Sequence, residues 1–422
     1  MAVEKSVYRG LGLARHEGQV VFVSRGLPGD RLRVRVESVT RGYARARIEA
    51  TLEPSAARRA SPCSLFPHCG GCAYQELDYA RQLTLKEAIL RESLARAGVP
   101  WPGEIPVHGS PEEGWRTRAF LHLEVRGQEV RLGLREERSH RLVSLGRCLQ
   151  LTPGLDAVAH ALREALTPHI HLARRIEGMA LAESNKGGTV VASLETRLSS
   201  AEVGSLASLR TQSPWLTGLG AVVGSPGQRH FVLLRGEPYV ESRIDGRRLR
   251  SHVLSFFQAN RFLLGDMVRT VGRLTPPGGR LLDLYAGVGL FALTVGGAAE
   301  DVVAVEGAPL AVEDAKANAS AAGLTHVHWR CEDVREALHR LPVAPGERVI
   351  LDPPRAGAGS EVVAAIAARQ PEGIVYVSCD PTTLARDLKL FAELGYNAAS
   401  LHAFDLFPDT FHLETVAQLL PR

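Results

Sequence analysis

One cysteine near the C-terminus stands where an enzyme can place a nucleophile. The apolar run 374–377 predicts a buried strand, and Ser378-Cys379-Asp380-Pro381 follows it directly. Ligands of open α/β sheets bind outside the carboxyl ends of the strands, so we expect Cys379 to face a ligand crevice. A thiolate in such a position is suited to covalent catalysis. The alternative is an inert cysteine buried in the core.

Four other cysteines have the spacing of metal ligands. Cys63, Cys69 and Cys72 lie in a loop rich in proline and glycine, and Cys148 follows much later. Three thiols on one tight loop can converge on a metal centre, and the fold would supply the fourth. On spacing alone, tetrahedral zinc and a 4Fe–4S cluster are equally favoured. Unligated buried thiols are the minor alternative, and His68 in the same loop is expected to be a bystander.

A glycine segment predicts a second binding site. The apolar strand 281–284 runs into Tyr285-Ala286-Gly287-Val288-Gly289, where the glycines allow close approach of a ligand to the backbone. The next strand, 302–305, ends at Glu306, whose carboxylate can accept hydrogen bonds from ribose hydroxyls. Gly287-x-Gly289-x-x-Ala292 also fits a dinucleotide fingerprint, although that pattern alone is weakly specific.

Two further acids favour S-adenosylmethionine (SAM) over a dinucleotide. Asp283 precedes the glycines, as in SAM-dependent enzymes, and strand 349–351 ends in Asp352-Pro353-Pro354, a motif of methyltransferases that act on planar nitrogenous targets. In amino-methyltransferases an aromatic residue follows, whereas here Arg355 follows. Methylation of an adenine or cytosine nitrogen is therefore a minor alternative.

The elements that carry these residues predict an α/β protein with three domains. Strand–helix alternation from 251 to 422 indicates a doubly wound sheet, and the motifs above make it a SAM-dependent methyltransferase sheet in expectation. Residues 56–250 are expected to form a mainly β central domain that carries the cysteine loop, with helices near 78–98 and 152–168. Residues 1–55 contain short alternating strands, which predict a small OB-like β-barrel.

The N-terminal segment is basic. The whole chain of 422 residues has a net charge of +4, but residues 1–59 contain twelve basic and six acidic side chains. Leu32, Val34 and Val36 alternate with arginines, which places a row of arginines on one face of a strand. A solvated barrel face is the simple interpretation, and contact with RNA is the favoured one.

Composition excludes several classes of protein. Hydrophobic residues make up 45% and charged residues 23% of the chain, as in globular proteins. No apolar stretch reaches the roughly 18 residues that span a bilayer, and the first residues lack the apolar core of a signal peptide. We expect a cytoplasmic protein without membrane contact, monomeric and with no obligate protein partner.

Taken together, these motifs resemble the RNA uracil-5-methyltransferase family, and the resemblance extends over nearly the whole chain. The segment 378–387 (SCDPTTLARD) is similar to its nucleophile motif, Phe407-Pro408 with His412 and Glu414 to its general-base motif, and 257–260 (FQAN) to a cofactor-side segment. The N-terminus is similar to a TRAM domain, an RNA-binding barrel. Ribosomal RNA enzymes that carry both a TRAM domain and an iron–sulfur cluster fit best.

The resemblance implies a role for each motif residue. Cys379 would be the nucleophile and Glu414 the general base, and the cysteine cluster would hold [4Fe-4S]. The SAM-site candidates include the two glycines of the loop described above. The full set is Gln258, Tyr285, Gly287, Gly289, Glu306, Asp333 and Asp352. Leu290 replaces an asparagine of some relatives, so its side chain is excluded, and Trp115 and Thr117 replace a tyrosine and an asparagine.

The expected activity is SAM-dependent methylation of carbon 5 of a uridine, most of all in 23S ribosomal RNA. The same chemistry on transfer RNA and a non-catalytic RNA-binding iron–sulfur protein are the alternatives. An NAD-dependent dehydrogenase leaves Cys379 and Glu414 without a role. A target base in folded RNA must be splayed or flipped out to reach such a pocket.

Overall fold

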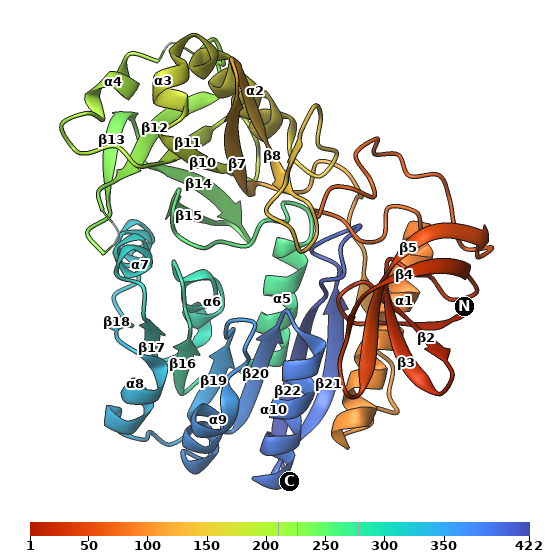
Figure 1. Cartoon of the computed structure of the whole chain (residues 1–422). Helices are drawn as coiled ribbons and strands as arrows, with labels where there is room; N and C mark the ends of the chain where they lie inside the picture. Colours follow the sequence, from red (N-terminus) through yellow and green to blue (C-terminus); the bar gives the residue numbers. More distant parts are fainter. Residues whose placement is uncertain (210, 226, 277) are drawn as a thin grey trace.

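The computed structural model describes residues 1–209, 211–225, 227–276 and 278–422. Within these residues the strands form four sheets. Figure 1 shows the N-terminal barrel (red) at one side, a helix-covered sheet (yellow to green) at the top and the C-terminal sheet (blue) below. Among the described helices, none combines the length and the apolar character that crossing a membrane requires.

The first sheet is a small barrel, as the alternating N-terminal pattern predicts. Val23 and Leu32 point into its core and are at most 1% exposed. Ala2 pairs with Arg31, which closes the first strand against the fourth. In sheet order the strands are β1 (Val3–Val7), β2 (Leu11–His16), β3 (Gln19–Ser24), β5 (Tyr43–Glu53) and β4 (Arg31–Val39).

The predicted row of arginines lies on the solvent side of β4, but its charge is partly neutralised. Antiparallel pairing brings glutamates of β5 beside it, so Arg31 contacts Glu53 at 2.6 Å and Arg35 contacts Glu49 at 2.8 Å. No ion pair joins Arg33 to another described residue. This face is therefore less positive than the arginine pattern suggests.

The central part is a seven-stranded sheet with helices on one face, close to the predicted mainly β arrangement. Its strands, in sheet order, are β13 (His230–Gly236), β12 (Leu216–Val223), β11 (Val190–Thr196), β10 (Ile176–Glu183), β7 (Arg118–Arg126), β8 (Glu129–Arg135) and β9 (Leu142–Ser144). The helical segments are α2 (Pro153–Leu166), η1 (Thr167–His169), α3 (Ile170–Ala173) and α4 (Gly204–Ala207). A separate hairpin of β14 (Tyr239–Ile244) and β15 (Arg247–His252) leads to the C-terminal part.

The C-terminal sheet has eight strands in the described residues and confirms the predicted doubly wound methyltransferase class. Its order is β18 (Val327–Cys331), β17 (Asp301–Glu306), β16 (Arg280–Leu284), β19 (Arg348–Leu351), β20 (Gly373–Ser378), β22 (Glu414–Pro421), β21 (Tyr396–Phe404) and β6 (Val107–His108). The helical segments are α5 (Leu264–Leu274), α6 (Leu290–Thr294), η2 (Gly296–Ala298), α7 (Pro309–Ala321), α8 (Val334–Arg340), α9 (Gly359–Ala368) and α10 (Pro381–Glu393). Leu282 and Leu284 pack into one core layer and Leu281 into the other, since successive strand residues face opposite sides.

One segment of the predicted central domain joins this sheet. α1 (Tyr79–Ala97) packs against α10, and β6 pairs with the edge strand β21. The helix ends as predicted, because Gly98 adopts the left-handed conformation and caps it. Residues 79–108 therefore support the C-terminal sheet, although they precede the central sheet in the chain.

Candidate active site

The nucleophile candidate Cys379 lies at the carboxyl end of β20, directly before α10. Asp380 caps this helix, with its carboxylate accepting from the backbone N–H of Thr382 at 2.8 Å and of Thr383 at 3.3 Å. The cap fixes the strand-to-helix turn. Because the turn is fixed, the half-buried Cys379 is held at the ligand-binding edge of the sheet.

Glu414 lies at the same edge because its strand runs the other way. β22 is antiparallel to β20 with Ser378 opposite Thr415, so the next step of this register brings Cys379 opposite Glu414. Glu414 is 2% exposed, and its Oε2 has no hydrogen-bond partner among the described residues. A buried carboxylate oxygen without a partner is available to a substrate proton.

The electrostatics of the site disfavour negative charge in the free protein. Burial raises the pKa of Cys379 to about 12, and the nearby carboxylates of Glu414 and Asp352 add to that effect. Burial and Asp352 also raise the pKa of Glu414 well above its ordinary value of 4.5. Arg355 acts in the opposite direction on both groups. A buried acid with a raised pKa is a stronger base once it ionises.

Arg355 and Tyr8 are site residues that the motif analysis did not assign. Arg355 follows the Asp352-Pro353-Pro354 motif and approaches His412, with 3.2 Å between Nη2 and Nε2. Tyr8 comes from the barrel: its hydroxyl donates to the carbonyl of Cys379 at 3.4 Å, and its ring packs edge-on against Phe411. The position of Arg355 beside the motif was a usable signal, whereas nothing local marks Tyr8.

Asp352 and Gln258 are brought together beside the candidate nucleophile Cys379. Asp352 follows β19, the parallel neighbour of β20, and burial raises its pKa to about 7. Gln258 is 5% exposed and its Nε2 donates to Asp352 Oδ2 at 3.5 Å, while its Oε1 has no partner among the described residues. The pair therefore offers a free amide oxygen and a carboxylate to a bound molecule.

The glycine loop after β16 forms a cradle. Asp283 is fully buried and accepts from the N–H of Ala292 at 2.7 Å, which ties the strand to α6. A Cβ added to Gly287 would meet no atom within 4 Å, so open space lies above this position. By contrast, a Cβ on Gly289 would meet the Trp329 side chain at 2.7 Å. The loop is closed on one side and open on the other, as a cofactor requires.

Glu306 and Tyr285 complete the cradle. Glu306 accepts from the N–H of Gly287 at 2.9 Å and of Ala308 at 2.8 Å, which joins the loops after β16 and β17. Each of its oxygens retains capacity for a hydroxyl. Tyr285 has a positive φ of 63°, the left-handed conformation, and is half-buried.

Asp333 lies at the end of the next strand but has a structural task. It caps α8, accepting from the N–H of Arg335 at 2.9 Å, and its side chain is 51% exposed. Desolvation acts to raise the pKa of Asp333, but the backbone N–H and the guanidinium of Arg335 together lower it below its ordinary value. The strand order places it on the cofactor side, two strands away from the glycine loop.

The four predicted metal ligands line one cavity beside the cysteine loop. Cys63, Cys69, Cys72 and Cys148 are all free thiols, and they share this cavity with leucine side chains and Arg116. Burial raises the pKa of Cys72 to about 12 and also raises the pKa of Cys69 and Cys148. A bound metal holds such thiols as thiolates and offsets this desolvation.

Arg116 adds a positive charge to this cavity. The flanking residues Trp115 and Arg118 contribute to the packing of the fold. Burial lowers the pKa of Arg116, and the charges of three of these cysteines act to raise it. Its guanidinium lies 4.7 Å from the centroid of the Trp115 ring. Trp115 is fully buried, and Arg118 donates to the carbonyl of Ser255 at 2.8 Å. The Trp115 and Arg118 side chains are therefore held within the protein.

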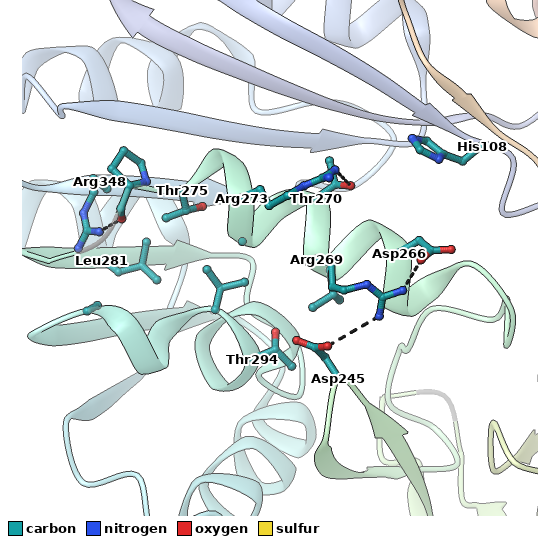
Figure 2. Close-up of a pocket in the computed structure, with 15 residues that line it drawn as sticks. His108, Asp245, Asp266, Arg269, Thr270, Arg273, Thr275, Leu281, Thr294 and Arg348 are labelled. Atoms are coloured by element: carbon teal, nitrogen blue, oxygen red, sulfur yellow. Dashed lines mark hydrogen bonds and ion pairs between the residues drawn. The ribbon is translucent and has the colours of Figure 1, made fainter.

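A large groove of about 800 Å³ lies away from all these residues. Leu281 and Arg348, at the amino ends of β16 and β19, line it. Figure 2 shows Arg269 in this groove bridging Asp245 and Asp266. Since Cys379 and the glycine loop lie at the carboxyl ends of the strands, the groove is separate from the candidate active site.

Comparisons with known proteins agree with this arrangement. The family model described as tRNA (Uracil-5-)-methyltransferase matches residues 78–421, and a TRAM domain model matches residues 3–48. The chain is 35% identical to a 23S rRNA (uracil(1939)-C(5))-methyltransferase, RlmD, of Alkalilimnicola ehrlichii, over 99% of this chain and 95% of that protein. It is 33% identical to an uncharacterized RNA methyltransferase of Thermosynechococcus vestitus, over 99% and 97% of the two chains.

A solved structure is similar over the full length. The Pyrococcus abyssi tRNA (uracil-54, C5)-methyltransferase, in complex with S-adenosyl-L-homocysteine, superposes with a TM-score of 0.78 at 25% identity and covers 100% of both chains. The family match covers most of the chain, including residues 378–387 and 407–414. The chain therefore belongs to the tRNA (Uracil-5-)-methyltransferase family and is a SAM-dependent RNA (uracil-5-)-methyltransferase.

Proposed function

We propose that the enzyme methylates uracil through a covalent adduct, with Cys379 as the nucleophile and Glu414 as the general base. The observation that carries this proposal is the antiparallel pairing of β20 with β22, which ends at Ser378 opposite Thr415. The adjoining residues, Cys379 and Glu414, therefore lie at one sheet edge. The partnerless Oε2 of Glu414 and the adjacent Arg355 support it.

The chemistry explains why both groups are needed. The Cys379 thiolate adds to carbon 6 of uracil, and the electrons of the double bond move to carbon 5 and oxygen 4. Carbon 5 takes the methyl group that SAM supplies when bound, the sulfur–methyl bond breaks, and S-adenosylhomocysteine is the leaving group. Glu414 then removes the carbon-5 proton, the double bond re-forms and the thiolate leaves. Arg355 lowers the cost of charge on both protein groups.

SAM would be held between the glycine loop and the nucleophile. We assign Tyr285, Gly287 and Gly289 to the loop that approaches it and Glu306 to its ribose hydroxyls. Gln258 and Asp352 would contact its reactive end or the edge of the uracil. Asp333 would lie at the far side of this site, and its capping role, which uses Oδ1, leaves Oδ2 for the cofactor.

The cysteine cavity would hold a [4Fe-4S] cluster bound by Cys63, Cys69, Cys72 and Cys148. All four thiols surround one cavity, yet no three His, Cys, Asp or Glu side chains of the described residues are close enough together to hold a single ion. A four-iron cluster spreads its ligands more widely than zinc does, and the charge of Arg116 suits an anionic cluster. Because uracil methylation transfers no electrons, the cluster would be structural.

Metal analysis tests this assignment. Protein purified without oxygen should be brown and contain about four irons per chain, the content of one such cluster. Stoichiometric zinc without broad visible absorption would contradict it.

The RNA would be 23S ribosomal RNA. Relatives named as 23S rRNA methyltransferases cover nearly the whole chain at 32–35% identity, whereas the similar structure of a tRNA enzyme is 25% identical. A groove of about 230 Å³ between the barrel, the cysteine loop and residues 410–412 carries Arg9, Arg25 and Arg116 and is suited to RNA phosphates. The ranges 1–55, 56–250 and 251–422 would act as RNA-binding barrel, cluster domain and catalytic domain.

Two experiments test the function. First, mass mapping of 5-methyluridine with and without the gene should show a loss in 23S rRNA; a loss confined to tRNA would favour the alternative substrate. Second, Cys379→Ala should abolish transfer of tritiated methyl groups while SAM binding persists. Cys331→Ala is the matched control, since Cys331 is an exposed free thiol. Normal turnover by Cys379→Ala would contradict covalent catalysis.

A further inference from the structure

A buried aspartate connects the segment before Glu414 to the rest of the protein. Asp409 is 3% exposed, and three glutamine side chains donate to its carboxylate. Gln75 and Gln150 donate to Oδ2 at 3.0 and 2.8 Å, and Gln82 donates to Oδ1 at 2.9 Å. Both oxygens are thus occupied, so Asp409 is not placed to take a proton from a substrate.

Two of these glutamines belong to the cysteine segments. Gln75 follows Cys72 by three residues, and its Nε2 also lies 3.5 Å from the Cys72 sulfur. Gln150 follows Cys148 by two residues. The two segments are far apart in the chain, but both end on the same oxygen of Asp409.

The backbone makes the same connection. The carbonyl of Asp409 accepts from the N–H of Ala73 at 2.7 Å and of Tyr74 at 2.9 Å, and its own N–H donates to Gln82 Oε1 at 3.0 Å. Asp409 has a φ of 63°, a conformation that non-glycine residues keep only where the surroundings hold it. The side-chain and backbone hydrogen bonds described above come from residues 73–82 and from Gln150, and the Arg59 guanidinium lies 3.9 Å from Oδ1.

This arrangement matters for Glu414, which begins β22 five residues later. At the other end of the segment, Lys86 pairs with Asp405 at 2.6 Å. Residues 405–413 connect β21 to β22 and form the loop that presents the Glu414 carboxylate. We call this segment the base loop. Among the hydrogen bonds described here, none joins Glu414 directly to one of the four cysteines.

We propose that Asp409 is a positioning residue through which the occupied cysteine site fixes the base loop and thereby the place of Glu414. The inference rests on the proposed function and deepens it. Metal bound by Cys72 and Cys148 holds the Gln75 and Gln150 segments, and these hold Asp409. The cluster then serves proton removal without taking part in it.

Hydrogen–deuterium exchange of the full-length protein tests the coupling without an activity measurement. Chelating the iron should speed exchange in peptides covering 405–413 and 73–74, and leave 327–340 unchanged. In Asp409→Asn the base loop should exchange fast whether or not iron is present. Asp245→Asn, on the far side of the sheet, is the matched control. Equal protection of the base loop before and after chelation in the wild type would overturn the inference.

A trapping experiment tests the effect on the reaction. RNA with 5-fluorouridine has no carbon-5 proton to remove, so it stops the wild-type reaction at the methylated adduct. Asp409→Asn should form this adduct at the wild-type rate, but turn over ordinary ribosomal RNA about a hundredfold more slowly, the scale expected for roughly 1 Å of misplacement. It should also accumulate adduct on ordinary RNA.

The outcomes separate the two proposals. If the wild type forms no adduct on the fluorinated RNA, covalent catalysis itself fails. If the wild type forms it and Asp409→Asn turns over normally, the positioning role alone fails. Gln150→Leu removes one donor to Asp409 and leaves the sequence of the base loop intact. It should likewise form the adduct on fluorinated RNA at the wild-type rate and turn over ordinary RNA more slowly. Equal loss of trapping and turnover in both variants, with full iron content, would also overturn the positioning role.

Discussion

Replacing Glu414 by glutamine isolates its role as a base from its role in the fold. The two side chains have the same shape, and Oε2 of Glu414 makes no hydrogen bond to a described residue. The substitution therefore breaks no hydrogen bond of that oxygen. It removes a carboxylate that burial and Asp352 already disfavour, so a loss of activity cannot be assigned to unfolding.

The size of the effect follows from the task. General acid–base catalysis contributes about 10²–10⁴ in rate, or about 3 to 5 kcal/mol of barrier. We expect turnover to fall by that factor while Cys379 still adds and the methyl group still transfers. The methylated RNA should then remain attached to Cys379 and survive a denaturing gel.

The pH dependence has a defined sign. The pKa of Glu414 in the folded protein lies above its ordinary value of 4.5, so its ionisation destabilises the fold as pH rises. Glu414→Gln should therefore be at least as stable as the wild type at pH 7, and this advantage should vanish below about pH 4.5. Turnover of the wild type should rise with pH as Glu414 ionises, and Glu414→Gln should lack this rise.

Single-turnover kinetics with tritiated SAM, followed by gel analysis, measures both products. Glu393→Gln is the control, since this residue at the end of α10 is 58% exposed. Normal turnover by Glu414→Gln with no adduct would refute the assignment of the base. An adduct that also forms in the Cys379→Ala background would refute the assignment of the nucleophile.

Three further predictions concern the supporting structure. Lys86→Met should lower the free energy of unfolding by about 3–5 kcal/mol, because it leaves the fully buried Asp405 without its counter-ion. Denaturant titration measures this change, and a decrease below about 1 kcal/mol would contradict a strong buried ion pair. Tyr8→Phe should lower kcat more than it raises KM for RNA, since the hydroxyl that it removes touches the nucleophile turn; a pure KM effect would assign it to RNA binding instead. Arg33→Gln with Arg45→Gln should reduce the slope of log affinity against log salt by about 0.7–0.9 for each RNA phosphate that the protein no longer neutralises, whereas an unchanged slope would exclude this barrel face from RNA binding.

Much of the site could be predicted because its chemistry is local in the sequence. Cys379 follows an apolar run, and parallel strands of an α/β sheet present their carboxyl ends at one edge, so its place at that edge needed no further information. The glycine loop and Glu306 obey the same rule, and close spacing groups Cys63, Cys69 and Cys72, whereas only the fold brings Cys148 to the same cavity. The barrel followed from alternation of apolar and charged residues.

Other features depend on contacts between distant segments, which no local pattern encodes. The pairing of β4 with β5 set Glu53 and Glu49 against the arginine row and changed its charge. Tyr8 reaches the nucleophile turn only because the barrel docks there, and the antiparallel insertion of β22 brings Glu414 across from Cys379. Asp409 resembles an ordinary loop residue until the fold surrounds it with glutamines. The sequence determines strand ends and residue types, whereas burial, charge pairing and the partners of a buried carboxylate arise only when separate segments pack together and exclude water.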